Sequence, residues 1–284
     1  MTYKTLDLQQ GSKSWLDYRA SRIGASDVSA ILGIGHDTPY KKWLEKFGFG
    51  EKKTSPAMQH GIDHEPIARE AFIKETGILV TPRVIESTIH KFMLASLDGL
   101  DFDEKCAVEI KCPYHRENHD IALDGMVPEI YYPQLQHQMF ILQIPMMYYF
   151  SWFEDSTKII EVPYDNAYVI NMIEKEKEFY ECMQSLSPPT LSARDYATCT
   201  DPEALNKANM LIELKQKMKE MERQEEELKT DLIQYASQSN MKIGDLSVSK
   251  VIKKGAIDYK GIPLLKEVDL ETHRKPSTTY WRVA

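Results

Sequence analysis

The chain has 284 residues, a hydrophobic content of 42% and a formal net charge of -8, which is the composition of an ordinary globular protein. No apolar run reaches the ~20 residues that a membrane-spanning helix needs, and the N-terminus MTYKTLDLQQ lacks the apolar stretch of a secretory signal. We therefore expect a cytoplasmic protein with no membrane association. The acidic charge also disfavours indiscriminate coating of nucleic acid.

The first part of the chain predicts helices. Residues 13–32 indicate one helix, a short turn at Ile23–Gly24, and a second helix capped by Ser26 or Asp27. Two further amphipathic helices are expected, one around Trp43 that ends at Gly48 and one over residues 57–77 that ends at Gly77.

The central part of the chain is rich in β-branched and aromatic residues, which favour strands. A helix is predicted among these strands over residues 133–142. Helices followed by a strand meander, a helix and more strands indicate an α/β fold with a mixed central sheet flanked by helices. The predicted strands cover residues 78–86, 92–98, 107–112, 147–153 and 158–163.

A long helix is predicted after Asp201, with an apolar a/d stripe formed by Leu211, Leu214, Met218, Met221, Leu228 and Leu232. Packing of this stripe onto the same domain or a neighbouring helix is favoured over an intermolecular coiled coil, because the stripe spans only about three heptads. Residues 241–259 then alternate like a strand pair around residues 244–245. We expect a main α/β domain over 1–190, a helical segment over 191–240 and a basic β-containing segment over 241–284.

Charge is distributed unevenly over the C-terminal part. Residues 161–231 hold sixteen acidic and nine basic side chains, a net of -7, whereas residues 241–284 hold nine basic and five acidic, a net of +4. The basic segment also carries Tyr259, Tyr280 and Trp281. These aromatic side chains can stack on nucleobases, although a role in the core of a small subdomain is somewhat favoured.

The strongest chemical constellation is Asp98, ten intervening residues, and then Glu109-Ile110-Lys111. Adjacent antiparallel strands lie ~4.8 Å apart, so Asp98 and Glu109 can converge on one cation. Because strand side chains alternate between faces, Glu109 and Lys111 share a face while Ile110 points into the core. A solvated hairpin is the simple alternative, but CAVEIKC otherwise reads as a buried strand, where unpaired charges are costly.

Two carboxylates suit magnesium, which takes hard oxygen ligands. Such a metal polarises a phosphodiester, and a lysine beside it can orient or deprotonate the attacking water or neutralise the developing charge. The constellation therefore favours phosphodiester hydrolysis.

Five motifs occur in the order seen in YqaJ-type viral recombinases: WLDYRASRIGASDVSAILG, GIDHEPIAREAF, LASLDG, VEIKCP and PQLQHQMF. The chain thus resembles lambda-type phage exonucleases of the PD-(D/E)XK nuclease superfamily over residues 12–160. The resemblance implies that Asp98, Glu109 and the Ile110 carbonyl are metal ligands and that Lys111 is the catalytic lysine. Glu65 is similar to the helical glutamate that helps to organise the metal centre. Leu97 stands where the proline of the PD motif is expected.

The resemblance also assigns a site for a terminal 5′-phosphate. Arg19 and Ser26 resemble the arginine and serine that bind this group, and Ser96 and Gln136 resemble residues that line the same pocket. A guanidinium can donate two parallel hydrogen bonds to phosphate, and a helix N-terminus attracts anions. From the residues alone, Ser26 is more simply an N-cap, Gln136 a polar position on a buried helix, and Arg22 competes with Arg19.

Together these features predict a Mg²⁺-dependent 5′→3′ exodeoxyribonuclease that degrades one strand of linear duplex DNA, with Mn²⁺ expected to substitute. The resemblance further implies phage-type recombination, a homotrimer, and a single-strand annealing recombinase as partner. The alternatives are a structure-selective or nicking endonuclease with the same metal site, and a non-catalytic DNA-binding or annealing protein.

Overall fold

The computed structural model describes residues 2–49, 54–236 and 240–250. Its two units are Met1–Thr198 and Cys199–Ala284. The described part of the first unit is built on a seven-stranded mixed sheet of order β1-β3-β4-β5-β6-β7, with the short β2 paired to β4. The strands are β1 (Tyr3–Leu6), β2 (Ile23–Gly24), β3 (Val80–Ser87), β4 (Met93–Asp101), β5 (Ala107–Lys111), β6 (Met146–Phe153) and β7 (Ser156–Pro163).

Neighbouring strands of this sheet run antiparallel except for two pairs. The β5–β6 and β2–β4 pairs are parallel. The α-helices of the unit are α1 (Lys13–Ala20), α2 (Val28–Ile31), α3 (Pro39–Lys46), α4 (Pro56–Thr76), α5 (Glu117–Leu123), α6 (Tyr132–Leu142) and α7 (Asn166–Gln184), and the 3-10 turns are η1 (Ala25–Asp27) and η2 (Ala193–Asp195). This is the mixed, helix-flanked sheet that the sequence predicts.

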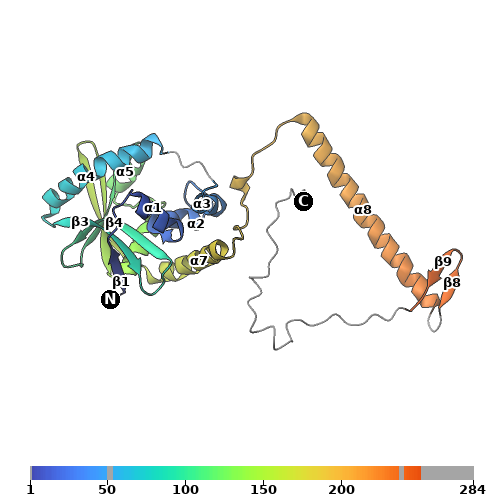
Figure 1. Cartoon of the computed structure of the whole chain (residues 1–284). Coiled ribbons are helices and arrows are strands. Elements are labelled where there is room, and N and C mark those ends of the chain that lie inside the picture. The colour runs from blue at the N-terminus through green and yellow to red at the C-terminus, as the bar shows by residue number, and fades with distance from the viewer. Residues whose placement is uncertain (1, 50–53, 237–239, 251–284) are drawn as a thin grey trace, which may run out of the picture. The chain divides into compact units, whose positions relative to one another are not determined.

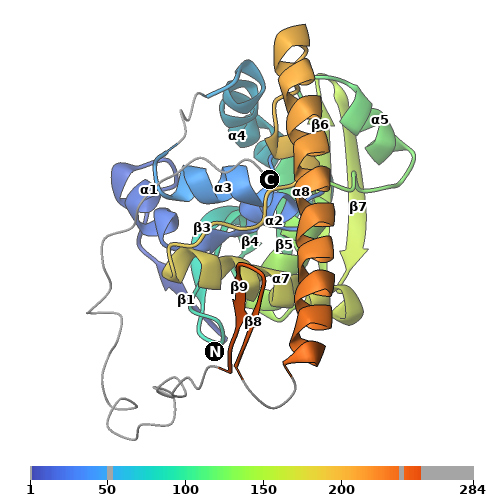
Figure 2. The same ribbon diagram turned by 90° about the vertical axis from the view of Figure 1, so that its right-hand side faces the viewer.

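Helices cover both faces of the sheet (Figure 1). The helix α4 packs on one face, where Phe72 contacts an apolar cluster that includes Val108 and Ile110. The helices α2, α6 and α7 supply the larger core on the other face, which includes Leu135 and Tyr149. Figure 2 shows α5 beside the long strands β6 and β7. The strand β5 is therefore enclosed between α4 and α6, which positions its charged residues.

The segment over residues 13–32 differs from the prediction. Ile23–Gly24 is not a turn but a short strand, because it pairs with Met93 and Leu94 of β4. Ser26 does not cap a helix either, since it lies within η1 and its side chain accepts a hydrogen bond from Arg19. Asp27 precedes α2 but accepts from the Gly24 N–H instead of capping that helix. The strand β1 and the helices α5 and α7 were not predicted.

The other predicted helices and strands of the first unit are confirmed to within a few residues. The unit extends beyond the expected boundary at 190, because Arg194 donates to the carbonyls of Gly33, Gly35 and His36. Asp195 likewise binds the Thr38 hydroxyl that caps α3.

The described part of the second unit consists of α8 (Pro202–Tyr235) and the antiparallel pair β8 (Met241–Ile243) and β9 (Leu246–Val248). The long helix is as predicted, and so is a strand pair around residues 244–245, whereas residues 251–259 of the predicted pair lie outside the described residues. None of the described residues of α8 is buried, so within this unit its apolar stripe is not packed on the described segments. Tyr259, Tyr280 and Trp281 lie outside the described residues. No helix in the described ranges is long and apolar enough to cross a membrane.

Candidate active site

Asp98 and Glu109 lie across adjacent antiparallel strands, as the sequence predicts. The register pairs Gly99 with Val108 and Leu100 with Ala107. The Ile110 N–H donates to Asp98 Oδ2 at 2.8 Å. Both carboxylates are buried, with 7% of Asp98 and 1% of Glu109 exposed. Two acidic groups are thus held side by side with little access to water.

The Glu109 carboxylate is held by three donors. Lys111 Nζ and Gln134 Nε2 each donate to its Oε1 at 2.5 Å, and Gln138 Nε2 donates to its Oε2 at 2.7 Å. Lys111 Nζ also donates to Gln134 Oε1 at 3.1 Å and lies 5.0 Å from the centre of the Tyr131 ring. Neither glutamine nor Tyr131 was singled out from the sequence. Gln134 and Gln138 lie four residues apart, so they share one face of α6.

Glu65 reaches the same cluster from α4. Arg69, one turn further along this helix, donates from Nη2 to Glu65 Oε1 and from Nε to the Asp98 backbone carbonyl at 2.7 Å. Arg69 therefore links α4 to β4 and fixes Glu65 near the carboxylates of the sheet. Sequence reasoning missed Arg69, although its spacing of four residues from Glu65 is the signal that could have identified it.

Burial and mutual repulsion together determine the electrostatics of this cluster. Burial, reinforced by the negative charges of Glu109 and Glu65, raises the pKa of Asp98 well above its ordinary value. Burial and Glu109 also raise the pKa of Glu65, with Arg69 acting in the opposite direction. Burial alone would lower the pKa of Lys111, but Glu109 and Asp98 raise it above its usual value. Three carboxylates face two cations, so the cluster carries an excess of negative charge.

The residues present fit a hard divalent cation. Asp98, Glu109 and Glu65 offer carboxylate oxygens, the ligands that magnesium prefers, and a cation would relieve the repulsion that raises the Asp98 pKa. The Gln138 Oε1 atom is buried without a hydrogen-bond partner. Among the described residues, no group of three or more His, Cys, Asp or Glu side chains already has the arrangement of a metal site. The donor chemistry of the three carboxylates suits magnesium.

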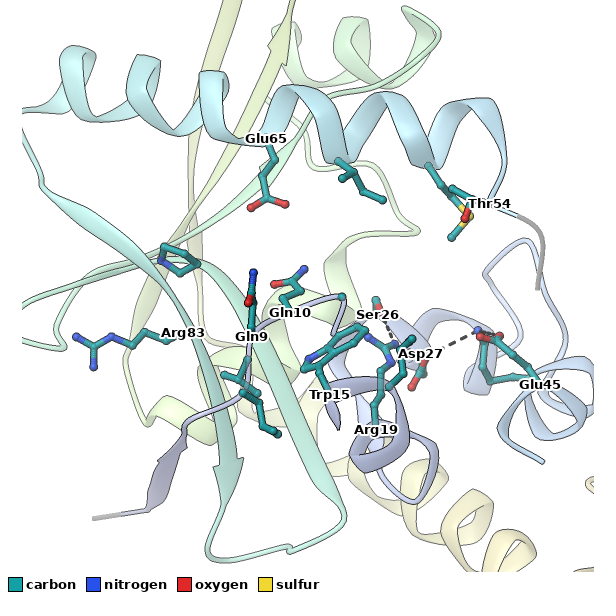
Figure 3. Close-up of a pocket in the computed structure, with 18 of the residues that line it drawn as sticks. Gln9, Gln10, Trp15, Arg19, Ser26, Asp27, Glu45, Thr54, Glu65 and Arg83 are labelled. Carbon is teal, nitrogen blue, oxygen red and sulfur yellow. Dashed lines mark hydrogen bonds and ion pairs between the residues drawn. The ribbon is translucent and has the colours of Figure 1, made fainter. Parts of the chain in front are cut away.

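A pocket of about 1200 Å³ opens beside this cluster. Glu65 and Arg69 of α4 form one wall, and Trp15, Arg19 and Ser26 form the opposite one. Figure 3 shows Glu65 projecting from α4 into the space that Arg19 and Ser26 border across from it. The structure thus brings the predicted phosphate-binding pair and the predicted helical glutamate to one cavity.

Arg19 is bound on one of its terminal nitrogens. Its Nη2 donates to Ser26 Oγ at 2.7 Å and to Asp27 Oδ1 at 2.6 Å. Asp27 is buried and also accepts from Lys46 Nζ at 2.6 Å. Lys42 Nζ lies 3.7 Å from Asp27 Oδ1. One carboxylate therefore lies among three cations.

The pKa values of this group follow from that imbalance. Burial would raise the pKa of Asp27, but Arg19, Lys46 and Lys42 together hold it well below its ordinary value. Burial lowers the pKa of Lys46, and repulsion by Arg19 and Lys42 adds to this effect, against the attraction of Asp27. Each cation attracts Asp27 but is repelled by the other two, so the group favours the ionised form of Asp27.

The other candidate residues for the phosphate pocket differ in how they are placed relative to it in the structure. Arg22 donates to Glu86 at 3.0 Å and is not among the residues that line the pocket, whereas Arg19 is. Ser96 accepts from the Trp15 indole N–H at 3.0 Å and so borders the pocket through that ring. Gln136 does not line the pocket, because its amide donates to the Pro163 carbonyl and accepts from the Asp165 N–H, at and just after the end of β7. The helical period turns Gln136 away from the face that carries Gln134.

The chain is similar to known proteins in both sequence and fold. Residues 14–144 match the family model described as the YqaJ-like viral recombinase domain. An alkaline exonuclease from Laribacter hongkongensis has 22% sequence identity and a TM-score of 0.55, with 62% of this chain and 94% of that chain covered. A structure of that exonuclease in complex with dAMP gives the same values. The fold is therefore that of this nuclease.

A phage-related exonuclease from Haemophilus somnus 129PT has 14% identity and a TM-score of 0.45, with 58% of this chain and 96% of that chain covered. No curated protein matches the sequence at a significant level.

Proposed function

We propose that this protein is a Mg²⁺-dependent exodeoxyribonuclease that digests one strand of linear duplex DNA from its 5′ end. The observation that carries the proposal is the pairing of two sites on one pocket. The wall formed by Glu65 and Arg69 adjoins the buried Asp98–Glu109–Lys111 cluster, and the opposite wall carries Arg19 and Ser26. The YqaJ-like domain and the fold shared with an alkaline exonuclease support the same reaction class.

Asp98, Glu109 and the Ile110 carbonyl would hold the magnesium ion, with Glu65 helping to organise it. When bound, the ion supplies Lewis-acid polarisation of the scissile phosphodiester. Mn²⁺, which also accepts oxygen ligands, would replace it. Gln134 and Gln138 keep the Glu109 carboxylate in one orientation by donating to its two oxygens.

Lys111 acts as a positioned cation. An ammonium group has three N–H donors, and two are directed to Glu109 and Gln134. The third is left for a phosphate oxygen or for the attacking water. Because its partners fix the ammonium before substrate arrives, the stabilisation of developing negative charge needs little reorganisation.

Arg19 and Ser26 would read the terminal phosphate. The Nε and Nη1 atoms of Arg19 donate no hydrogen bond to any described residue, so both remain for an anion. A terminal phosphate carries more negative charge than an internal diester, which makes a guanidinium site selective for chain ends. Binding of the 5′ end on this wall would present the strand to the carboxylates across the pocket and set the polarity.

The family resemblance extends the proposal to assembly and partners. A ring-shaped homotrimer would keep the duplex enclosed, and the exposed 3′ strand would pass to a single-strand annealing recombinase. Light scattering of the purified full chain tests the trimer directly, since a monomeric mass at micromolar concentration contradicts it.

The direct test of the function uses linear duplex DNA labelled separately at its 5′ and 3′ ends. With Mg²⁺ we expect early release of the 5′ label as mononucleotide, loss of the 3′ label only late, and no release in EDTA. Closed circular duplex of the same sequence is the matched control and should persist. Cleavage of the circle as fast as the linear form would assign the metal site to an endonuclease instead.

A further inference from the structure

The guanidinium of Arg19 is confined by more than its hydrogen bonds. Its Cζ lies 5.1 Å from the centre of the Trp15 ring, a cation–π contact. The backbone of Gly24 also lies against it. A Cβ placed on Gly24 would lie 3.0 Å from Cζ and from Nη2 of Arg19 and 3.3 Å from Nη1. The absence of a side chain at Gly24 is thus what gives the guanidinium its position.

Asp27 fixes the orientation of the same group. Its Oδ1 and the Ser26 Oγ take both hydrogens of Arg19 Nη2. Its Oδ2 accepts from the Gly24 N–H at 2.9 Å and from Lys46 Nζ at 2.6 Å. Lys46 in turn donates to the backbone carbonyls of Arg19 and Arg22. The carboxylate therefore ties the Arg19 side chain, directly and through Lys46, to the backbone of residues 19–24.

We propose that Gly24 and Asp27 are positioning residues that set the selectivity of this pocket for a 5′-phosphate. The inference rests on the proposed function of Arg19. Gly24 leaves the space in which the guanidinium lies, and Asp27 holds one nitrogen so that Nε and Nη1 are oriented toward an incoming anion. A donor fixed before binding loses little side-chain entropy when the ligand arrives. Selectivity therefore depends on these two residues although neither needs to touch the phosphate.

Substitution of Gly24 isolates this effect from the stability of the fold. Its backbone has φ -82° and ψ 151°, an extended conformation that alanine adopts without strain. The atoms that an added Cβ meets belong to the end of the flexible Arg19 side chain. The Gly24→Ala protein can therefore relax by displacing the guanidinium. Gly61 of α4 provides the matched control, because a Cβ there meets nothing within 4 Å.

The experiment measures binding of two short duplexes that differ only in a 5′-phosphate or a 5′-hydroxyl. Binding is followed by fluorescence anisotropy in EDTA, so cleavage does not interfere. The readout is the ratio of the two dissociation constants. We expect Gly24→Ala and Asp27→Asn to lower the preference for the phosphorylated end by a factor on the order of ten, as for loss of a hydrogen bond to a charged group. Gly61→Ala should keep the wild-type ratio.

A kinetic measurement with Mg²⁺ distinguishes positioning from a general defect. Both variants should raise KM for phosphorylated ends much more than they lower kcat, because the carboxylates across the pocket are untouched. Thermal unfolding of each variant verifies folding. If Asp27→Asn does not fold, the Gly24→Ala result decides alone.

The outcomes separate this inference from the proposed function. If Arg19→Ala abolishes the preference while Gly24→Ala keeps the wild-type ratio, the positioning role is wrong and the phosphate site stands. If the wild-type protein itself binds both ends equally, the phosphate-reading part of the proposed function fails.

Discussion

The replacement Asp98→Asn should abolish cleavage and at the same time stabilise the metal-free protein. Asparagine has nearly the shape of aspartate, and its side-chain oxygen can still accept from the Ile110 N–H. What disappears is a carboxyl group whose ionisation is disfavoured by burial and by the negative charges of Glu109 and Glu65, in a cluster with only two cations, Lys111 and Arg69. The variant cluster is therefore electrically balanced without a metal ion.

The size of the effect follows from the spacing of the strands. Two like charges ~5 Å apart repel by about 3 kcal/mol at an effective dielectric constant of about 20. The loss of the attraction to Lys111, and of charge assistance in the bond from Ile110, offsets most of that gain. A net gain of about 1 kcal/mol is consistent with replacing a buried functional charge, and it corresponds to a rise in Tm of roughly 2–4 °C for a unit of this size.

Thermal unfolding in EDTA near neutral pH measures this gain. Asp101→Asn is the control, because the Asp101 carboxylate accepts from the Lys105 and Cys106 N–H groups at 2.8 Å each in the β4–β5 turn. That substitution should leave stability unchanged or reduce it slightly. Added Mg²⁺ should raise the Tm of the wild type and not of Asp98→Asn. A lower Tm for Asp98→Asn than for the wild type in EDTA refutes the electrostatic reasoning.

Three further predictions concern other parts of the molecule. Lys111→Ala should reduce kcat by a factor on the order of 10² or more, and full recovery of the rate at high metal concentration would contradict the role given to the ammonium group. Because the folded-state pKa of Asp27 is depressed, the stability it contributes should be present above the unfolded value of about 3.9 and be lost as the pH falls through the folded value. Urea unfolding at several pH values should therefore show Asp27→Asn least stable relative to the wild type near neutral pH, and a constant difference down to about pH 3 would count against this. Removal of residues 241–284, whose net charge is +4, should weaken duplex binding and flatten its dependence on salt, and an unchanged salt slope would exclude a direct role in binding DNA.

The sequence by itself determined the sheet and its central pair of strands. The predicted strands and the helix over 133–142 follow from β-branched and aromatic runs and from turn residues, which are local properties of the chain. The spacing of Asp98 and Glu109 around one turn also determined that the two carboxylates lie opposite each other, since a hairpin register depends on little besides loop length.

The helical period predicts from the sequence which glutamines of α6 share a face. Gln134, Gln136 and Gln138 alternate in the sequence, but a helix places the first and third on one face and the second on the other. The face itself can be predicted, whereas the identity of its partner cannot. Gln134 and Gln138 donate to Glu109 because β5 lies against their face of α6. This placement of β5 is a property of the tertiary structure.

Only the tertiary structure decided which arginine lines the pocket proposed to bind the 5′ end. Arg19 and Arg22 are equivalent as local sequence, and the choice between them depends on Glu86, 64 residues from Arg22, which accepts from that arginine and not from Arg19. The strand pairing of Ile23–Gly24 with β4 likewise determines that Ser26 lies in a 3-10 turn and not at a helix N-terminus. Contacts of this kind join segments that are distant in the chain. The partner of a buried charge is the opposite charge that lies near it in the folded protein, and the local pattern of residues does not encode that proximity.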